Sequence, residues 1–257
     1  KIKILSDYFN SQTQKNKIWA LSILSNSFAS KLIKVRDIKG LIKEKIDEEM
    51  FLYSYDYVGD LAETVSLLWP RNQIKKLHSY SLSSFMNDLK KQKSKDDLII
   101  FIENFFNSSS PDEIYTIIKI LLGGLRVGVS NELLKESLSK IGIRTKEEIE
   151  ENWYGFSFPY YGFFEWLEGE DLPEKFNNKN LFHSFMLSNP FDENLVNKIN
   201  IKDYRCEYKW DGIRAQITIS SSGKIYSRNG EDISNSFPEL KIKSNKVSVL
   251  DGELVVK

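Results

Sequence analysis

The sequence predicts a chain of two parts, an all-helical region over residues 1–187 and an antiparallel, β-rich α+β region over residues 188–257. In the first part, apolar residues recur at the three- and four-residue spacing of amphipathic helices. In the second part they alternate with polar residues, as in half-buried strands. Between the two patterns lies Ser188-Asn189-Pro190, which is typical of a linker. We therefore expect a multidomain fold with a boundary near residue 187.

Local signals place the individual elements. Helices are expected within residues 1–50 and over residues 60–68, 81–91, 96–106, 111–122 and 130–138. The best-defined start is at Ser110, which can cap a helix whose first position is Pro111. Strands are expected over residues 204–208, 215–220, 224–228 and 247–250, and a short helix over residues 237–240.

The composition excludes several classes of protein. With 41% hydrophobic and 28% charged residues the chain suits a soluble globular protein, and no apolar run is long enough to span a bilayer. Cys206 is the only cysteine, which rules out an internal disulfide and fits a reducing compartment. His78 and His183 are too few for a histidine-rich metal site. No signal peptide precedes the first helix. We expect an intracellular protein, cytoplasmic or nucleoid-associated, with no membrane partner.

Charge is unevenly distributed, although the formal net charge is +0. Residues 1–45 contain ten Lys or Arg and three Asp or Glu, whereas residues 145–175 contain nine Asp or Glu and two Lys. The basic run could bind phosphates, but a solvated helix surface explains it at least as well. Aromatic residues are dense over residues 151–191. Their acidic surroundings disfavour base stacking, so we expect a packing segment there.

One stretch near the C-terminal end combines residue types that carry chemistry. Residues 207–214 have the sequence EYKWDGIR, and a strand pattern resumes directly after them. Lys209 is therefore expected at a strand–turn junction, where burial and the cation of Arg214 would favour a neutral, nucleophilic amine. A lone Lys-x-Asp-Gly recurs by chance in ordinary hairpins, so a functional interpretation needs further motifs in the same chain.

Two such motifs occur at sensible distances after the lysine. SRNG at residues 227–230 places Arg228 where a strand enters a turn, and DGE at residues 251–253 places two carboxylates in an apolar strand. Acids in such a run are costly to bury without partners, so a metal, a sugar hydroxyl or a cation is expected beside at least one of Asp251 and Glu253. For Asp251, a surface turn with Gly252 remains an alternative.

A glycine-rich turn separates two of the predicted helices. Residues 121–130 have the sequence LLGGLRVGVS, in which Gly123, Gly124 and Gly128 allow close approach of a phosphate backbone. Arg126 adds a forked donor for phosphate oxygens. A plain helix–turn–helix corner with a solvated arginine explains the spacing equally well.

The three C-terminal motifs, in this order, resemble the nucleotidyltransferase signature of ATP-dependent DNA ligases. The resemblance is specific over residues 205–257, and residues 121–130 resemble the phosphate-contacting turn of the ligases' helical DNA-binding domain. It implies that residues 1–187 form an all-helical DNA-binding domain. Residues 188–257 would then begin the antiparallel, β-rich adenylation domain.

The resemblance also implies a role for each matching residue. Lys209 would attack the α-phosphorus of ATP and carry AMP, and Glu207 would contact the adenine amino group. Arg214 would contact the sugar and phosphate of the nucleotide, and Arg228 would hold the nucleotide or the nick. Glu253 would contact the ribose or position the divalent metal, expected to be Mg²⁺. These roles meet the needs of nucleotidyl transfer, which requires a nucleophile and cations that offset phosphate charge.

The implied partner is nicked double-stranded DNA, which Gly123, Gly124, Arg126 and Gly128 would contact. AMP would pass to a 5′-phosphate at the nick, and the neighbouring 3′-hydroxyl would displace it, in replication, repair or recombination. We expect the protein to act as a monomer. The later motifs of the adenylation domain and the C-terminal OB-fold domain are absent up to Lys257. We therefore expect a longer intact protein and no ligase activity from this chain alone.

Two other functions compete with this interpretation. RNA ligases and mRNA capping enzymes share the Lys-x-Asp-Gly core but lack a large helical region before it. A non-catalytic DNA-binding fragment with a degenerate nucleotide fold is the second alternative. The intact Lys209, Arg214 and Glu253 count against it.

Overall fold

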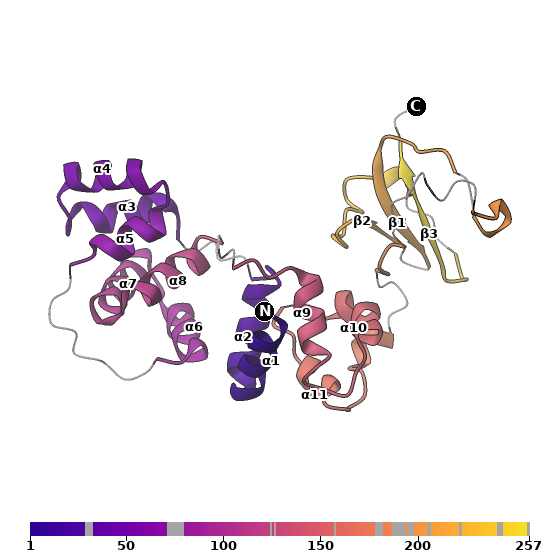
Figure 1. Ribbon diagram of the computed structural model, residues 1–257, viewed down its shortest axis with the longest axis horizontal. Coiled ribbons are helices and arrows are strands. Elements are labelled where there is room, and N and C mark those ends of the chain that lie inside the picture. The colour runs from indigo at the N-terminus through magenta and orange to yellow at the C-terminus, as the bar shows by residue number, and fades with distance from the viewer. Residues whose placement is uncertain are drawn as a thin grey trace. The chain divides into compact units, whose positions relative to one another are not determined.

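The computed structural model describes most of the chain and divides it into two compact units. It describes residues 1–28, 33–70, 80–123, 125, 127–156, 158–177, 182–186, 194, 198–204, 207–220, 223–240 and 244–255. The helical unit comprises Lys1–Lys146 and Ser157–Glu170, and the sheet unit comprises Glu147–Phe156 and Asp171–Lys257 (Figure 1). The predicted linker at residues 188–190 lies outside the described residues, and the boundary near residue 187 stays a prediction.

Helices make up the regular structure of the helical unit. They are α1 (Ile2–Ser11), α2 (Gln14–Leu24), α3 (Val35–Lys43), α4 (Glu48–Val58), α5 (Leu61–Leu68), α6 (Leu82–Lys91), α7 (Lys95–Ser108), α8 (Pro111–Leu121), α9 (Asn131–Leu138) and α11 (Phe163–Leu167). All the predicted helices are present, so the predicted all-helical first part is confirmed. None of the helices in the described ranges combines the length and apolarity needed to traverse a lipid bilayer.

Side-chain caps explain why several of these helices begin where they do. Ser110 accepts a hydrogen bond from the backbone N–H of Glu113, whose carboxylate accepts one from the Ser110 N–H in return. With Pro111 at the first position, this is a capping box, and the predicted cap at Ser110 is confirmed. Ser130 caps α9: its hydroxyl oxygen accepts a hydrogen bond from the backbone N–H of Leu133 at 3.2 Å.

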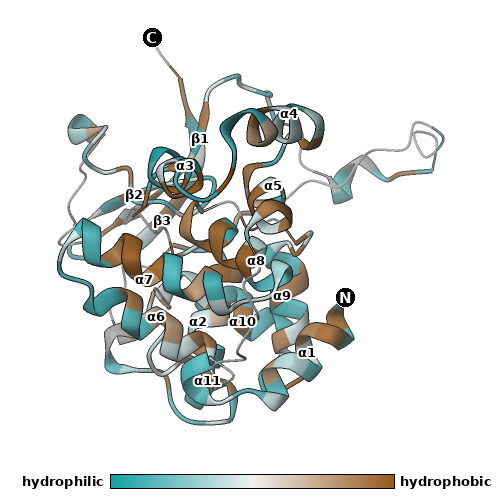
Figure 2. Cartoon of the chain, turned by 90° about the vertical axis from the view of Figure 1, so that its left-hand side faces the viewer, coloured by the Kyte–Doolittle hydropathy of each residue, from teal (hydrophilic) through white to brown (hydrophobic). Residues whose placement is uncertain are grey.

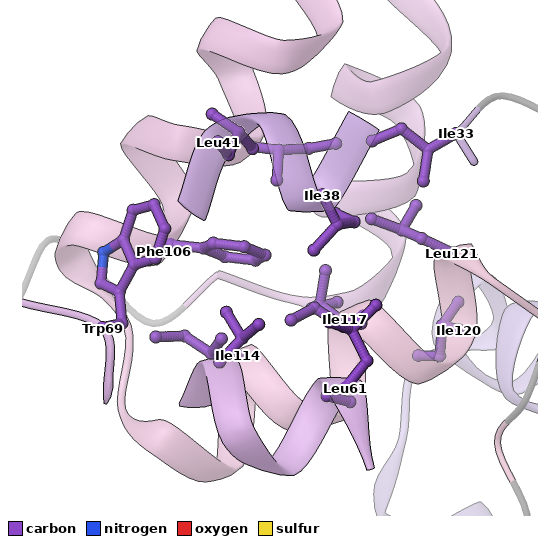
Figure 3. Packing of buried hydrophobic residues seen from close by; sticks show 14 of the residues in the cluster. Ile33, Ile38, Leu41, Leu61, Trp69, Phe106, Ile114, Ile117, Ile120 and Leu121 are labelled. Carbon is purple, nitrogen blue, oxygen red and sulfur yellow. The ribbon is translucent and has the colours of Figure 1, made fainter. Parts of the chain in front are cut away.

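The core of the helical unit is one cluster of aromatic and branched aliphatic side chains from α2 to α8 (Figure 3). Figure 2 shows the hydrophobic stretches of α5 and α8, which pack against each other. In this core Phe106 is 1% exposed, and its ring meets that of Trp69 edge-on at 5.2 Å. The predicted aromatic packing is confirmed in α11, where Phe163, Phe164 and Trp166 are buried.

Asp37, near the start of α3, is a nearly buried carboxylate held by several donors. Its side chain lies 2.6 Å from Lys95 Nζ and 3.6 Å from Arg36 Nε, and it accepts the backbone N–H of Lys34 at 2.9 Å. The hydrogen bond from Lys95 lowers the pKa of Asp37, and the Lys34 N–H and the two cations act in the same direction against the effect of burial. The carboxylate therefore stabilises the folded state in its ionised form.

This lowered pKa predicts a pH-dependent contribution to stability. The contribution is fully present above the ordinary pKa of an aspartate, about 3.9, and is lost as the pH falls through the lower folded-state value. We expect Asp37→Asn to lower the melting temperature at pH 7 and to differ less from the unmodified protein at pH 3. Thermal unfolding curves of both proteins across this range test it. Melting temperatures that stay equally far apart at both pH values would contradict the prediction.

The sheet unit contains a three-stranded antiparallel sheet in the order β2-β1-β3. Its strands are β1 (Ile213–Ile219), β2 (Lys224–Ser227) and β3 (Ser248–Leu254). The unit also contains α10 (Lys146–Asn152) and 3₁₀ turns at Trp153–Gly155, Glu174–Asn177, Ile201–Asp203 and Pro238–Leu240. Three predicted strands and the short helix near residue 238 are confirmed. Together with the helical unit, they confirm the predicted fold class.

The predicted strand at residues 204–208 is wrong for the residues described there. Tyr204, Glu207 and Tyr208 belong to no strand. The alternating pattern is present, but alternation shows only that a segment is suited to a sheet. Whether the segment joins a sheet depends on its pairing with distant segments, and the observed sheet is formed by β2, β1 and β3.

Candidate functional site

The register of the sheet brings the first and third motifs of the sheet unit onto one face. Arg214 of β1 lies opposite Glu253 of β3, and Gln216 lies opposite Asp251. Because side chains alternate between the two faces of a strand, all four project from the same side of the sheet. Asp251 and Gly252 lie inside β3, so the alternative of a surface turn at these residues is wrong.

Arg214 is held by an ion pair and by an aromatic ring. Its Nε donates to Asp251 Oδ1 at 3.2 Å and its Nη2 donates to Asp251 Oδ2 at 2.8 Å, a bidentate geometry. Nη2 also donates to the backbone oxygen of Met186 at 2.9 Å, and the guanidinium lies 4.6 Å from the ring centre of Phe185. The site thus contains a cation of fixed orientation.

The electrostatics of Arg214 also involve Glu207, at the start of the first motif. The hydrogen bond to Asp251 raises the pKa of Arg214, and the negative charges of Asp251, Glu253 and Glu207 act in the same direction, while burial opposes them. Glu207 itself is exposed. The charge of Arg214 therefore interacts with that of Glu207, from the same motif, and with that of Glu253, from the third motif.

Lys209 lies in a non-helical, non-strand stretch before β1, and its side chain is exposed. The expected burial at a strand–turn junction is therefore wrong, because Glu207 and Tyr208 directly before it belong to no strand and Tyr208 and Trp210 are also exposed, at 87% and 62%. Within the described residues, no ion pair or hydrogen bond engages the Lys209 amine.

Arg228 occupies a turn at the end of β2 and is exposed. The Ser227 side chain accepts hydrogen bonds from the backbone N–H groups of Asn229 and Glu231, at 3.3 Å and 3.2 Å, and fixes the turn. The sequence correctly places this arginine where a strand enters a turn. The structure shows no contact between Arg228 and the other predicted site residues within the described part of the chain.

The glycine-rich turn lies in the helical unit, between α8 and α9. Gly123 and Gly128 have φ values of +72° and +64°, in the left-handed region where glycine has no steric cost. Lys1 Nζ donates to the carbonyl oxygen of Gly128 at 3.0 Å, which places a cation beside the turn. Gly124 and Arg126, the other two predicted contacts, lie outside the described residues.

The candidate metal ligands of the site are the carboxylates on the sheet face that carries Arg214. No group of three or more metal-ligating side chains occurs in the described ranges. Both oxygens of Asp251 are engaged by Arg214, which leaves the partly buried Glu253 as the carboxylate on that face. Mg²⁺ is commonly held by one or two carboxylates together with the phosphates of a substrate, so this donor set fits such a shared ion.

Comparison with protein families covers both units. A profile described as "DNA ligase N terminus" matches residues 1–139, and one described as "ATP dependent DNA ligase domain" matches residues 185–257. The chain belongs to the ATP-dependent DNA ligase family, which confirms the resemblance found in the motifs.

Individual relatives agree with the family profiles. The chain is similar to the DNA ligase of Pyrobaculum arsenaticum, with 32% identity over 63% of this chain and 29% of that protein. It is similar to the DNA ligase of Thermococcus onnurineus, with 27% identity over 77% of this chain and 38% of that protein. For the DNA ligase of Ignicoccus hospitalis the identity is 24%, over 94% of this chain and 41% of that protein. The chain thus spans less than half of the length of these relatives.

Sequence reasoning missed the residues that surround Arg214. Phe185 and Met186 precede the predicted linker, in a stretch that loosely resembles the segment joining the two ligase domains, and no site role was expected for them. Gln216 is 3% exposed, yet it occupies an ordinary position in an alternating strand. One feature of the sequence could have indicated Gln216: it is a long amide side chain two residues after Arg214, and so on the same face of the predicted strand.

Proposed function

We propose that this chain is the front portion of a ligase that seals nicks in duplex DNA with ATP. The observation that carries the proposal is the register of β1 and β3, which sets Arg214 opposite Glu253 in a chain of the DNA ligase family. Lys209, with an exposed amine five residues before Arg214, supplies the nucleophile. The relatives are DNA ligases by name, and the same activity is proposed here for the longer polypeptide.

The proposed reaction has three steps. The Lys209 Nζ attacks the α-phosphorus of ATP, so that a P–N bond forms and the bond to the bridging oxygen of pyrophosphate breaks. An oxygen of the 5′-phosphate at the nick then attacks the same phosphorus and releases the lysine. The 3′-hydroxyl finally attacks the 5′-phosphorus, forms the phosphodiester bond and releases AMP.

Each residue of the site has a proposed task in the first step. Glu207 accepts a hydrogen bond from the adenine amino group, and Arg214 and Arg228 offset charge on the nucleotide phosphates. Glu253 contacts the ribose or holds Mg²⁺, which when bound would neutralise charge on the departing pyrophosphate. The pre-set guanidinium of Arg214 needs little reorganisation to take part, because Asp251 and Phe185 already fix its plane.

The direct test uses the full-length gene product. Its intact mass is measured before and after incubation with ATP and Mg²⁺, and its activity is measured on a nicked DNA duplex and on a nicked RNA duplex. A mass gain of one AMP together with sealing of nicked DNA supports the proposal. AMP uptake with sealing of RNA alone would favour the RNA ligase or capping class. Duplex binding without AMP uptake would favour a non-catalytic DNA-binding protein.

For the helical unit we propose that the turn between α8 and α9 binds the DNA backbone, irrespective of base sequence. Arg126→Ala is expected to weaken binding of duplex DNA evenly across sequences. It should also reduce the slope of log affinity against log salt by about 1, because one phosphate contact is lost. Fluorescence anisotropy over a salt series measures both quantities.

Arg36→Ala is the matched control, since it removes the same charge from α3. An equal change in both variants would assign the effect to overall charge instead of to the turn.

A further inference from the structure

A short segment of the sheet unit is fastened to the sheet face by side chains of β1. In residues 182–186, His183 donates its backbone N–H to Gln216 Oε1 at 2.8 Å, and Gln216 Nε2 donates to the His183 carbonyl at 2.9 Å. One buried amide thus satisfies both backbone groups of His183, as a neighbouring strand would. Phe182 is 2% exposed and packs against Tyr226 of β2, which anchors the beginning of the segment.

The same segment, residues 182–186, makes a second set of contacts with the sheet, through Arg214. The Arg214 guanidinium donates to the Met186 carbonyl and lies over the ring of Phe185, three and two residues beyond His183. Arg214 and Gln216 are two residues apart on one face of β1, so both fasteners come from the same rigid strand. The Phe185 ring therefore takes its position from the strand that carries the arginine it covers.

Some N–H groups of the Arg214 guanidinium are bound to acceptors and others are available to a ligand. Arginine has five N–H groups in a fixed fork. Nε and one N–H of Nη2 bind Asp251, and the other N–H of Nη2 binds Met186. Among the described residues, no acceptor engages Nη1. With one face covered by Phe185 and the donors of Nε and Nη2 engaged, the guanidinium keeps the two N–H groups of Nη1 for a ligand.

We propose that Gln216 and Phe185 are positioning residues that orient the free Nη1 edge of Arg214 toward the ribose or phosphate oxygens of ATP. This inference rests on the proposed function, because it takes the nucleotide to be the ligand of Arg214. An arginine side chain is otherwise flexible, and fixing it before binding lowers the entropy lost when a ligand is bound. Neither positioning residue needs to touch the nucleotide.

The test measures the KM for ATP and the maximal rate of protein–AMP formation in the full-length protein. Gln216→Met keeps the length of the side chain but removes the partners of the partly buried N–H and C=O of His183. We expect it to raise the KM about tenfold and to change the maximal rate less, because a positioned cation contributes chiefly to binding. Phe185→Leu, which keeps apolar bulk without a ring face, should act in the same direction and serves if Gln216→Met does not fold. Thermal unfolding is recorded for every variant.

A double-mutant cycle separates positioning from general structural damage. In an Arg214→Lys background the planar guanidinium is gone, so Gln216→Met should change the KM less than about twofold. An equal increase in KM with Arg214 and with the lysine, or no increase in either folded variant, would overturn the inference. If the unmodified full-length protein formed no AMP adduct, the proposed function itself would fail. This outcome differs from one in which the adduct forms but Gln216→Met has the same effect on the KM with Arg214 and with the lysine.

Discussion

Lys209→Ala is expected to abolish formation of the protein–AMP adduct. The amine is exposed, lies two residues after Glu207 and five before Arg214, and has no partner within the described residues that would withhold it from a ligand. Loss of an attacking nucleophile removes the covalent step itself, so the rate of adduct formation should fall by about 10⁴-fold or more. The full-length protein is incubated with ATP labelled at the α-phosphate, and the label retained on denatured protein is counted.

Two control variants separate a nucleophile from a cation that merely attracts ATP. Lys209→Arg keeps the positive charge, but a guanidinium stays protonated and does not attack phosphorus, so it should be as inactive as the alanine variant. Lys202→Ala removes an exposed lysine elsewhere in the same unit and should retain full labelling. Substantial labelling of Lys209→Arg, or loss of labelling in Lys202→Ala, would contradict the assignment of Lys209.

Predictions from the sequence succeeded where the determining contact is local. The start of α8 depends on Ser110, Pro111 and Glu113, all within four residues, and the predicted cap at Ser110 is confirmed. The turns at Gly123 and Gly128 likewise depend on the backbone freedom of one residue at a time. The helical first part and the antiparallel second part were predictable for this reason.

Predictions failed where the outcome depends on which segments meet. The pattern at residues 204–208 suits a strand, but Tyr204, Glu207 and Tyr208 belong to none. The same limit applies to Arg214 and Asp251, which are 37 residues apart and meet only because of the register of β1 and β3. The motifs identified the arginine, but its partners Asp251, Phe185 and Met186 depend on pairing that periodicity does not specify.

Phe106→Ala is expected to be the most destabilising of the proposed substitutions. Phe106 is 1% exposed on the inner side of α7, and its ring packs edge-on against Trp69 within the cluster formed by α2 to α8. Removal of a buried ring loses its transfer free energy and leaves a cavity that helices on several sides cannot fill, at a cost of about 3–5 kcal/mol. Many domains have a total stability of roughly 5–15 kcal/mol, so most of the margin of the helical unit would be lost.

Urea unfolding followed by circular dichroism measures this free energy, because the signal is dominated by the helices of this unit. Ile100→Ala is the matched control on the same helix: Ile100 is 56% exposed, so its truncation removes little buried surface and should change the free energy of unfolding by less than about 0.5 kcal/mol. A small loss for Phe106→Ala would mean that the core re-packs around the missing ring. An equal loss for both variants would show that α7 is sensitive to truncation wherever it occurs, and burial of Phe106 would not be the cause.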